Sequence, residues 1–129
     1  MVGWKHAQLG EHHQARTTFR QALILLRQVD DQYGQAFAWD GLGYTHHHLG
    51  QHQQATACYE QSLALYRDIG DRYVEAETLA RLGDTRHAAG DHAAATGNWR
   101  QALDIFTELG HPAAKEVRAK LHSVEPPSA

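Results

Sequence analysis

The sequence predicts an all-α fold, in which antiparallel helix pairs stack side by side into a right-handed α-solenoid. Three observations predict it: apolar residues recur at helical spacing, glycine-centred turns separate the helices, and the pattern returns after forty residues. Of the 23 positions in 9–31, 10 are identical in 49–71. Each unit of such a repeat exposes an apolar face alone, so stacking is expected to bury the core.

The elements follow from this repeat in chain order. Seven helices are expected, at residues 2–9, 12–28, 32–48, 52–68, 72–88, 92–108 and 112–122. They form one domain over 1–122, which divides into repeats 1–30, 31–70 and 71–110 and a capping helix at 112–122. The first helix pair is truncated. Residues 123–129, which contain two prolines, are expected to form a disordered tail.

Local signals support the predicted boundaries. Asp31 and Asp71 precede helices, where an aspartate can accept a free backbone N–H as an N-cap. Gly10 begins an expected turn between the first two helices, and Gly70 suits the left-handed residue that follows a helix. Pro112 falls at the first turn of the capping helix, where proline is tolerated.

Small residues recur where the two helices of a pair are expected to touch. Gly43 and Gly83 would let the first helix approach its partner, and Ala55 and Ala95 would receive the contact. One aromatic position, Phe19, Tyr59 and Trp99 in successive repeats, is expected to fill the gap to the next unit. A larger side chain at Gly43 is therefore expected to push the helix axes apart.

The composition excludes several classes of protein. The chain has 129 residues, 42% of them hydrophobic, and a net charge of −3, which gives no basic footprint for nucleic acid. No apolar run approaches the length of a membrane span, and the first residues lack the apolar core of a signal peptide. The single cysteine, Cys58, fits a reducing compartment. We expect a cytoplasmic protein without a nucleic-acid or membrane partner.

The stretch from Trp39 to Leu63 resembles the tetratricopeptide repeat (TPR) pattern. Trp39, Leu42-Gly43 and Ala55 followed by Tyr59 match W-x2-L-G-x2-Y…A-x3-F. The period is forty rather than 34 residues, the closing proline is absent, and the first-helix tyrosine is replaced. Histidine or arginine takes that tyrosine position, at His6, His46 and Arg86.

Forty-residue repeats of this kind resemble two groups of proteins. One is the Pins/LGN-type adaptors, and the other is the C-terminal TPR arrays of bacterial SARP/AfsR-type regulators. The amino-acid sequence of Thr78–Arg100 is more similar to that of the bacterial group. The resemblance implies a non-catalytic protein-interaction module in a larger bacterial transcriptional or signalling regulator, and a stand-alone TPR adaptor is the alternative.

The resemblance also implies a peptide groove, lined by the first helix of each pair. Its expected residues are Trp4, Phe37, Asp40, Tyr44, His47, Glu77, Asp84 and His87. This groove would be aromatic with an acidic bias, and it lacks the Lys and Asn that clamp C-terminal carboxylates in other TPRs. A basic, amphipathic peptide or helix is the expected partner, and a solvated face without a ligand is the alternative.

The eleven histidines raise the alternative of a metal-binding or enzymatic protein. His46, His47, His48 and His52 lie close in sequence. However, consecutive histidines on a helix point in different directions, and repeat-related residues lie about 10 Å apart. Motifs such as HExxH and GxSxG are missing from the sequence, and Cys58 adjoins the core. We expect no cofactor, no metal and no catalysis, which titration with Zn²⁺ can test.

The short first helix predicts an uncovered N-terminal end. Phe19, Leu23 and Leu26 would lack the neighbour that later repeats have, and Val2 and Trp4 would be exposed beside them. Upstream residues or a second copy of the chain would cover this end. A symmetric homodimer through the N-terminal ends is the simplest closed arrangement.

Overall fold

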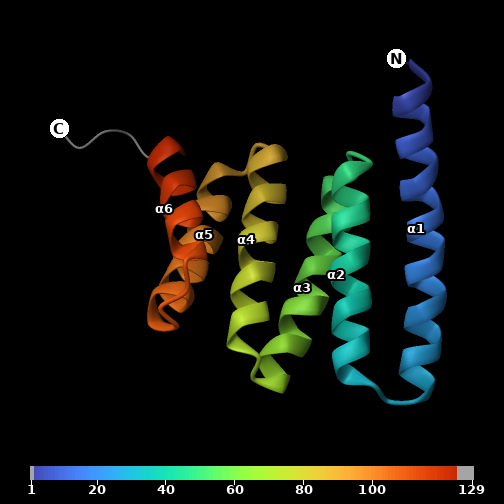
Figure 1. The fold of residues 1–129 in the computed structure, drawn as a ribbon, viewed down its shortest axis with the longest axis horizontal. Coiled ribbons are helices and arrows are strands. Elements are labelled where there is room, and N and C mark those ends of the chain that lie inside the picture. The colour runs from blue at the N-terminus through green and yellow to red at the C-terminus, as the bar shows by residue number, and fades with distance from the viewer. Residues whose placement is uncertain (1, 125–129) are drawn as a thin grey trace.

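The computed structural model describes residues 2–124, with side chains described from residue 9 onward. The described residues form six helices and no strand (Figure 1). The helices are α1 (Val2–Gln28), α2 (Gln32–His48), α3 (His52–Ile69), α4 (Arg72–Ala88), α5 (His92–Glu108) and α6 (Ala113–Val124). Each packs against the next in sequence, and the array runs from α1 at one end to α6 at the other. The all-α solenoid prediction is confirmed.

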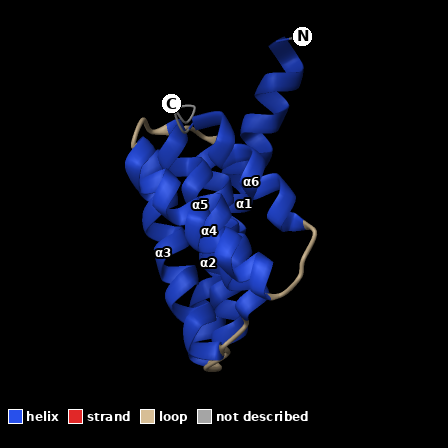
Figure 2. Cartoon of the chain, turned by 90° about the vertical axis from the view of Figure 1, so that its left-hand side faces the viewer, coloured by secondary structure: helices blue, strands red, loops and turns tan. Residues whose placement is uncertain are grey.

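The N-terminal helix differs from the prediction. The chain does not turn at Gly10, and α1 is one helix of 27 residues. Gly10 lacks the left-handed φ that Gly50 and Gly90 adopt at the later turns. A separate helix over 2–9 would be too short to be stable without a large packed face, whereas continuing α1 keeps every helical hydrogen bond. The first-repeat turn was therefore wrong, and the N-terminal turns of α1 extend past α2 (Figures 1 and 2).

The other boundaries agree closely with the prediction. The carboxylate of Asp31 accepts the N–H of Gly34 at 2.8 Å, and Asp71 accepts that of Val74 at 3.2 Å. Gly70, with φ of 84°, follows α3 as expected. The C-terminal helix α6 reaches Val124, so the predicted tail begins too early. Its remaining residues, 125–129, lie outside the described residues.

The glycine contacts set the distances between helices. A Cβ added at Gly43 would lie 2.7 Å from the ring of Tyr59, and one at Gly83 would lie 2.5 Å from Trp99. Both rings are buried, at 2% and 3% exposure. The ring of Phe19 packs instead against Gly41, in the next repeat. The predicted close approach at these glycines is thus present in the second and third repeats, but the aromatic ring fills the contact inside its own helix pair rather than the gap to the next unit.

The apolar core is larger toward the C-terminus. One cluster joins α3, α4, α5 and α6, and a smaller one joins α1, α2 and α3. Leu23 is buried at 5% exposure, contrary to the expectation that it would be partly uncovered, because α2 packs over it. Phe19 and Leu26 are partly buried. The side chains of Val2 and Trp4 lie outside those described.

Candidate peptide-binding face

The helices α2, α4 and α6 share one face of the array, which we call the groove face. It carries two hollows that meet at Arg81 and Asp84. The first, of about 290 Å³, is lined by Tyr44, His47, His48, Tyr59, Arg81, Asp84 and Thr85. The second, of about 160 Å³, is lined by Glu77, Ala80, Arg81, Asp84, Phe106, Ala113, Glu116, Val117 and Lys120. The groove face thus brings together side chains from all three helices.

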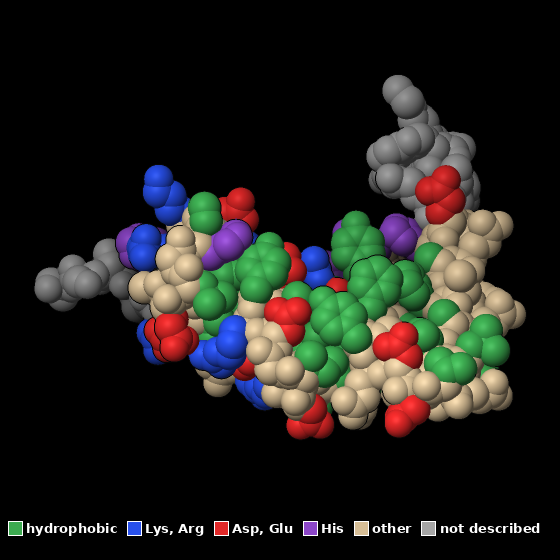
Figure 3. Space-filling view, turned by 60° about the horizontal axis from the view of Figure 1, so that its bottom comes forward, with side chains coloured by type: hydrophobic (Ala, Val, Ile, Leu, Met, Phe, Trp, Pro, Cys, Tyr) green, Lys and Arg blue, Asp and Glu red, His purple; other side chains and the backbone are tan. Residues whose placement is uncertain are grey.

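Exposed aromatic rings follow α2 along this face. Tyr33, Phe37 and Tyr44 are 49%, 60% and 52% exposed, and their spacing places them along one side of the helix. Tyr73 on α4 is 39% exposed. Figure 3 shows hydrophobic side chains gathered over the middle of the molecule, with acidic and basic groups among them. Aromatic side chains supply large contact area in protein interfaces.

Asp40 lies between the two helices rather than free in the groove. Its carboxylate accepts a hydrogen bond from Arg81 Nη1 at 2.6 Å. The other oxygen, Oδ1, is buried without a hydrogen-bond partner among the described residues. Burial raises the pKa of Asp40, and the guanidinium of Arg81 opposes this shift. Asp40 therefore ties α2 to α4.

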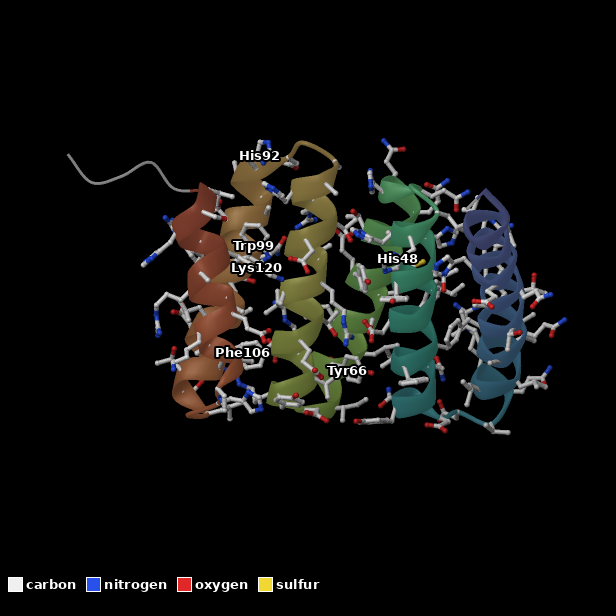
Figure 4. All side chains as sticks on the ribbon, turned by 45° about the horizontal axis from the view of Figure 1, so that its top comes forward. His48, Tyr66, His92, Trp99, Phe106 and Lys120 are labelled. Carbon is white, nitrogen blue, oxygen red and sulfur yellow. The ribbon has the colours of Figure 1, made fainter. Side chains whose placement is uncertain are left out.

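Asp84 joins three helices in the same way. It accepts Lys120 Nζ from α6 at 2.8 and 3.0 Å, and Trp99 Nε1 from α5 at 3.2 Å. Figure 4 labels Trp99 and Lys120 beside α4. The cations that pair with Asp40 and Asp84 are Arg81 and Lys120, and neither was predicted from the sequence. Because of these pairs, the two carboxylates do not give the groove face the acidic character that was expected. The carboxylates without a described ion pair in this region are Glu77, which accepts Tyr73 Oη at 3.2 Å, and Glu116.

The two predicted groove histidines contact the scaffold. His47 Nδ1 lies 2.9 Å from Thr85 Oγ1, and burial lowers the pKa of His47. His87 Nδ1 lies 2.9 Å from His92 Nδ1, and its ring is 5.5 Å from that of Trp99. Of the predicted groove residues whose side chains are described, Phe37, Asp40 and His87 line neither hollow. The side chain of Trp4 is outside those described.

Histidine rings gather more closely than the sequence analysis predicted. The ring of His48 stacks on His12 at 5.3 Å and meets His47 edge-on at 5.2 Å, while His47 lies 5.9 Å from His52. The two neighbouring side chains still point in different directions, as expected, because His47 reaches Thr85 on α4 whereas His48 stacks on His12 of α1. No group of three or more His, Cys, Asp or Glu side chains within the described residues is arranged to hold a metal ion.

Cys58 has the environment of a structural thiol. It is 7% exposed, and burial raises the pKa of the thiol to about 11. A thiol is nucleophilic only as the thiolate, so this environment suppresses its reactivity near neutral pH.

None of the helices in the described part of the chain is long and apolar enough to cross a membrane.

Some groove residues could have been found from the sequence, and others could not. Tyr33 and Tyr73 share one repeat position, which pointed to a common role. Arg81 stands where the previous repeat has Gly41, and Lys120 lies in the capping helix outside the repeat. No periodic signal therefore marked either cation.

Comparison with known proteins agrees with this geometry. No curated protein sequence matches the chain significantly. The family model of the tetratricopeptide repeat matches it twice, over residues 5–68 and 34–109. Together the two matches span both pairs of helices that turn around Gly50 and Gly90, and most of α1. The chain belongs to the tetratricopeptide repeat family.

Proposed function

We propose that this chain is a non-catalytic interaction module that binds a basic, amphipathic segment of a partner protein across the groove face. Tetratricopeptide repeats generally mediate protein–protein interaction. The observation that carries the proposal is the row of exposed rings on α2, formed by Tyr33, Phe37 and Tyr44. An apolar side of the partner would pack on these rings, in the manner of a helix or strand in a groove.

The charges on the groove face favour a basic partner. Glu77 and Glu116 line one hollow with no ion pair among the described side chains, whereas Asp40 and Asp84 already have cations. A lysine or arginine of the partner would therefore meet Glu77 and Glu116. Complementary charges of this kind mainly speed association and set orientation.

A random peptide library selected against the chain provides the test. The recovered peptides are expected to combine apolar and basic residues. Measured by fluorescence anisotropy, their affinity should fall about tenfold or more in the Phe37→Ser/Tyr44→Ser variant, which is a loss of 1.4 kcal/mol or more. Glu77→Lys/Glu116→Lys should slow association at low salt. Thermal melts of each variant establish that it remains folded.

Asp104→Lys on α5 is the control, because it makes the same kind of acid-to-lysine change, once rather than twice, at an exposed position that lines neither hollow. It should bind the selected peptides as the unmodified chain does. Equal affinity for all variants, or the recovery of acidic peptides, would move the binding surface away from the groove face.

We further propose that this module belongs to a larger bacterial regulator, which the resemblance of Thr78–Arg100 to TPR arrays of that type supports. In such a protein the module would respond to its partner and pass the signal to an upstream domain. The coding sequence around Met1 is the test. An open reading frame with an NTPase or DNA-binding domain supports the regulator, and one without such a domain supports the stand-alone adaptor.

Self-association through α1 is a second proposed interaction. Ile24 and Leu25 on this helix are 57% and 62% exposed, and Val29, directly after it, is 73% exposed; a symmetric pairing would cover them on both copies. Light scattering at about 100 μM, far above common specific-dimer dissociation constants, should give the mass of a dimer. Leu25→Glu/Val29→Glu should give a monomer. A monomer without the substitutions would exclude this pairing.

A further inference from the structure

A third hollow opens between α1 and α3. Its volume is about 420 Å³, and it shares no lining residue with the hollows of the groove face. Its walls are mostly apolar, with Leu23 and Ile24 from α1, Leu42 from α2, and Ala57 and Cys58 from α3. A volume of this size falls in the usual range of small-molecule sites, roughly 300–1,000 Å³.

Two arginines stand at this apolar hollow. Arg20 and Arg27 both line it from α1, two helical turns or about 10.5 Å apart along the axis. The guanidinium of Arg27 lies 5.4 Å from the centroid of the Trp39 ring, which orients it against one wall. Neither arginine has an ion pair with any side chain that the structure describes. The hollow therefore combines an apolar interior with two exposed arginines that have no ion pair among the described residues.

The equivalent gap in the next repeat is built differently. There Arg86 Nη2 donates to Glu60 at 2.6 Å and Arg86 Nη1 donates to Asn98 at 2.8 Å. These three side chains join α3, α4 and α5 by a polar bridge. The bridge satisfies the charge of Arg86 within the fold.

One repeat earlier, the same three positions hold residues that cannot form this bridge. Arg20 replaces the glutamate, His46 replaces the arginine, and Cys58 replaces the asparagine. His46 Nδ1 instead lies 2.6 Å from Gln51 Oε1. The gap between α1 and α3 thus keeps its positive charge without an internal partner. This difference leaves Arg20 and Arg27 exposed at the hollow, where their charge is available to a ligand.

We propose that the hollow between α1 and α3 binds a small amphiphilic carboxylate of the fatty-acid class. The hydrocarbon chain would lie against Leu23, Leu42 and Cys58, and the carboxylate would accept hydrogen bonds from Arg20 and Arg27. Guanidinium groups bind carboxylates through short, charge-assisted hydrogen bonds, often in pairs. A neutral amphiphile would gain no charge attraction from the two arginines, and a cationic one would be repelled by them.

Titration calorimetry with decanoate on the full chain tests the proposal. Saturable binding to one site is expected, and decyltrimethylammonium should give none. Arg20→Ala/Arg27→Ala should weaken decanoate binding by about tenfold or more. Arg16→Ala is the matched control, because Arg16 lies on the same helix outside the hollow and should leave binding unchanged.

A repeat transplant adds a second variant. Arg20→Glu/His46→Arg/Cys58→Asn installs the bridge of the next repeat, so it should fold and lose decanoate binding. Circular dichroism and thermal melts verify the fold of each variant. No saturable binding to the unmodified chain, equal binding by Arg20→Ala/Arg27→Ala, or equal binding of decyltrimethylammonium would overturn the proposal. None of these variants touches the groove face, so a failure here leaves the peptide-binding proposal intact.

Discussion

Leu25 in α1 and Ile105 in α5 occupy the same repeat position, two periods apart, but Leu25 is 62% exposed and Ile105 only 5%. The aromatic position shows the same trend, since Phe19 is partly buried and Trp99 is 3% exposed. The helix α5 packs against both α4 and α6, whereas α1 packs against α2. Burial in a repeat protein is therefore set by the neighbours of a helix as much as by its own pattern.

The largest expected effect comes from truncating the two equivalent side chains. Ile105→Ala should lower the free energy of unfolding by about 3 kcal/mol, because it leaves a cavity in a packed core. Leu25→Ala should change it by less than about 0.5 kcal/mol, since an exposed side chain loses few contacts. Chemical denaturation measures both. Similar losses would mean that α1 is covered in solution, for example by a second copy.

The glycine contacts provide the next comparison. Gly83→Leu should cost about 3 kcal/mol, because its Cβ would already lie 2.5 Å from the Trp99 ring. Gly97→Leu places the same side chain on α5, where nothing lies within 4 Å of the added Cβ. It should leave stability unchanged or raise it slightly, since leucine is the better helix former. Equal melting temperatures would contradict the close contact between α4 and α5.

The ion pair across the groove face should have an intermediate effect. Arg81→Met leaves the carboxylate of Asp40, whose side chain is 15% exposed, without its cation, and should cost about 2 kcal/mol. Adding Asp40→Asn to this variant should recover part of the loss, because the unpaired charge is removed. Arg118→Met, at an exposed position of α6, is the control. An additive double variant would show that the pair does not couple α2 to α4.

Substitution of Gly10 tests whether this residue lies inside a continuous helix or in the turn that the repeat predicted. Gly10→Ala should raise stability by up to about 1 kcal/mol, because alanine is favoured inside a helix and the added Cβ meets nothing within 4 Å. Gly90→Ala should lower stability by about 1 kcal/mol, because φ at this residue is +87°. Thermal melts compare the two. A loss at both positions would restore the predicted turn.

The smallest effect concerns pH. Burial lowers the pKa of His47 and His48, so the unfolded chain takes up protons first as the pH falls through about 6.5. Stability should therefore be lower at about pH 5.5 than at about pH 7.5. The raised pKa of Asp40 acts with the opposite sign, at more acidic pH. His48→Gln should reduce the difference between the two pH values, and an unchanged difference would assign it to other groups.

The sequence by itself determined the helices that follow α1, the aspartate and glycine caps around them, and the family. These features are local: the carboxylate of Asp31 reaches an N–H three residues away, and Gly70 ends its helix through its own φ. That Gly43 lies at a close helix contact also followed from the sequence, but its neighbour did not, because the ring of Tyr59 packs within its own repeat unit rather than toward the next. Periodicity and capping carry such information without any knowledge of the rest of the fold.

Only the tertiary structure decided which charges remain free and which apolar residues stay uncovered. Arg81 reaches Asp40 across 41 positions, and Lys120 reaches Asp84 across 36. These contacts depend on how α4 and α6 lie against their neighbours. Likewise, Gly10 stays helical because the segment before it gains more from continued backbone hydrogen bonds than from a separate short helix. A repeat pattern specifies the structure of each unit. Which residues are buried, which charges are paired and where a helix continues depend on the contacts between neighbouring units.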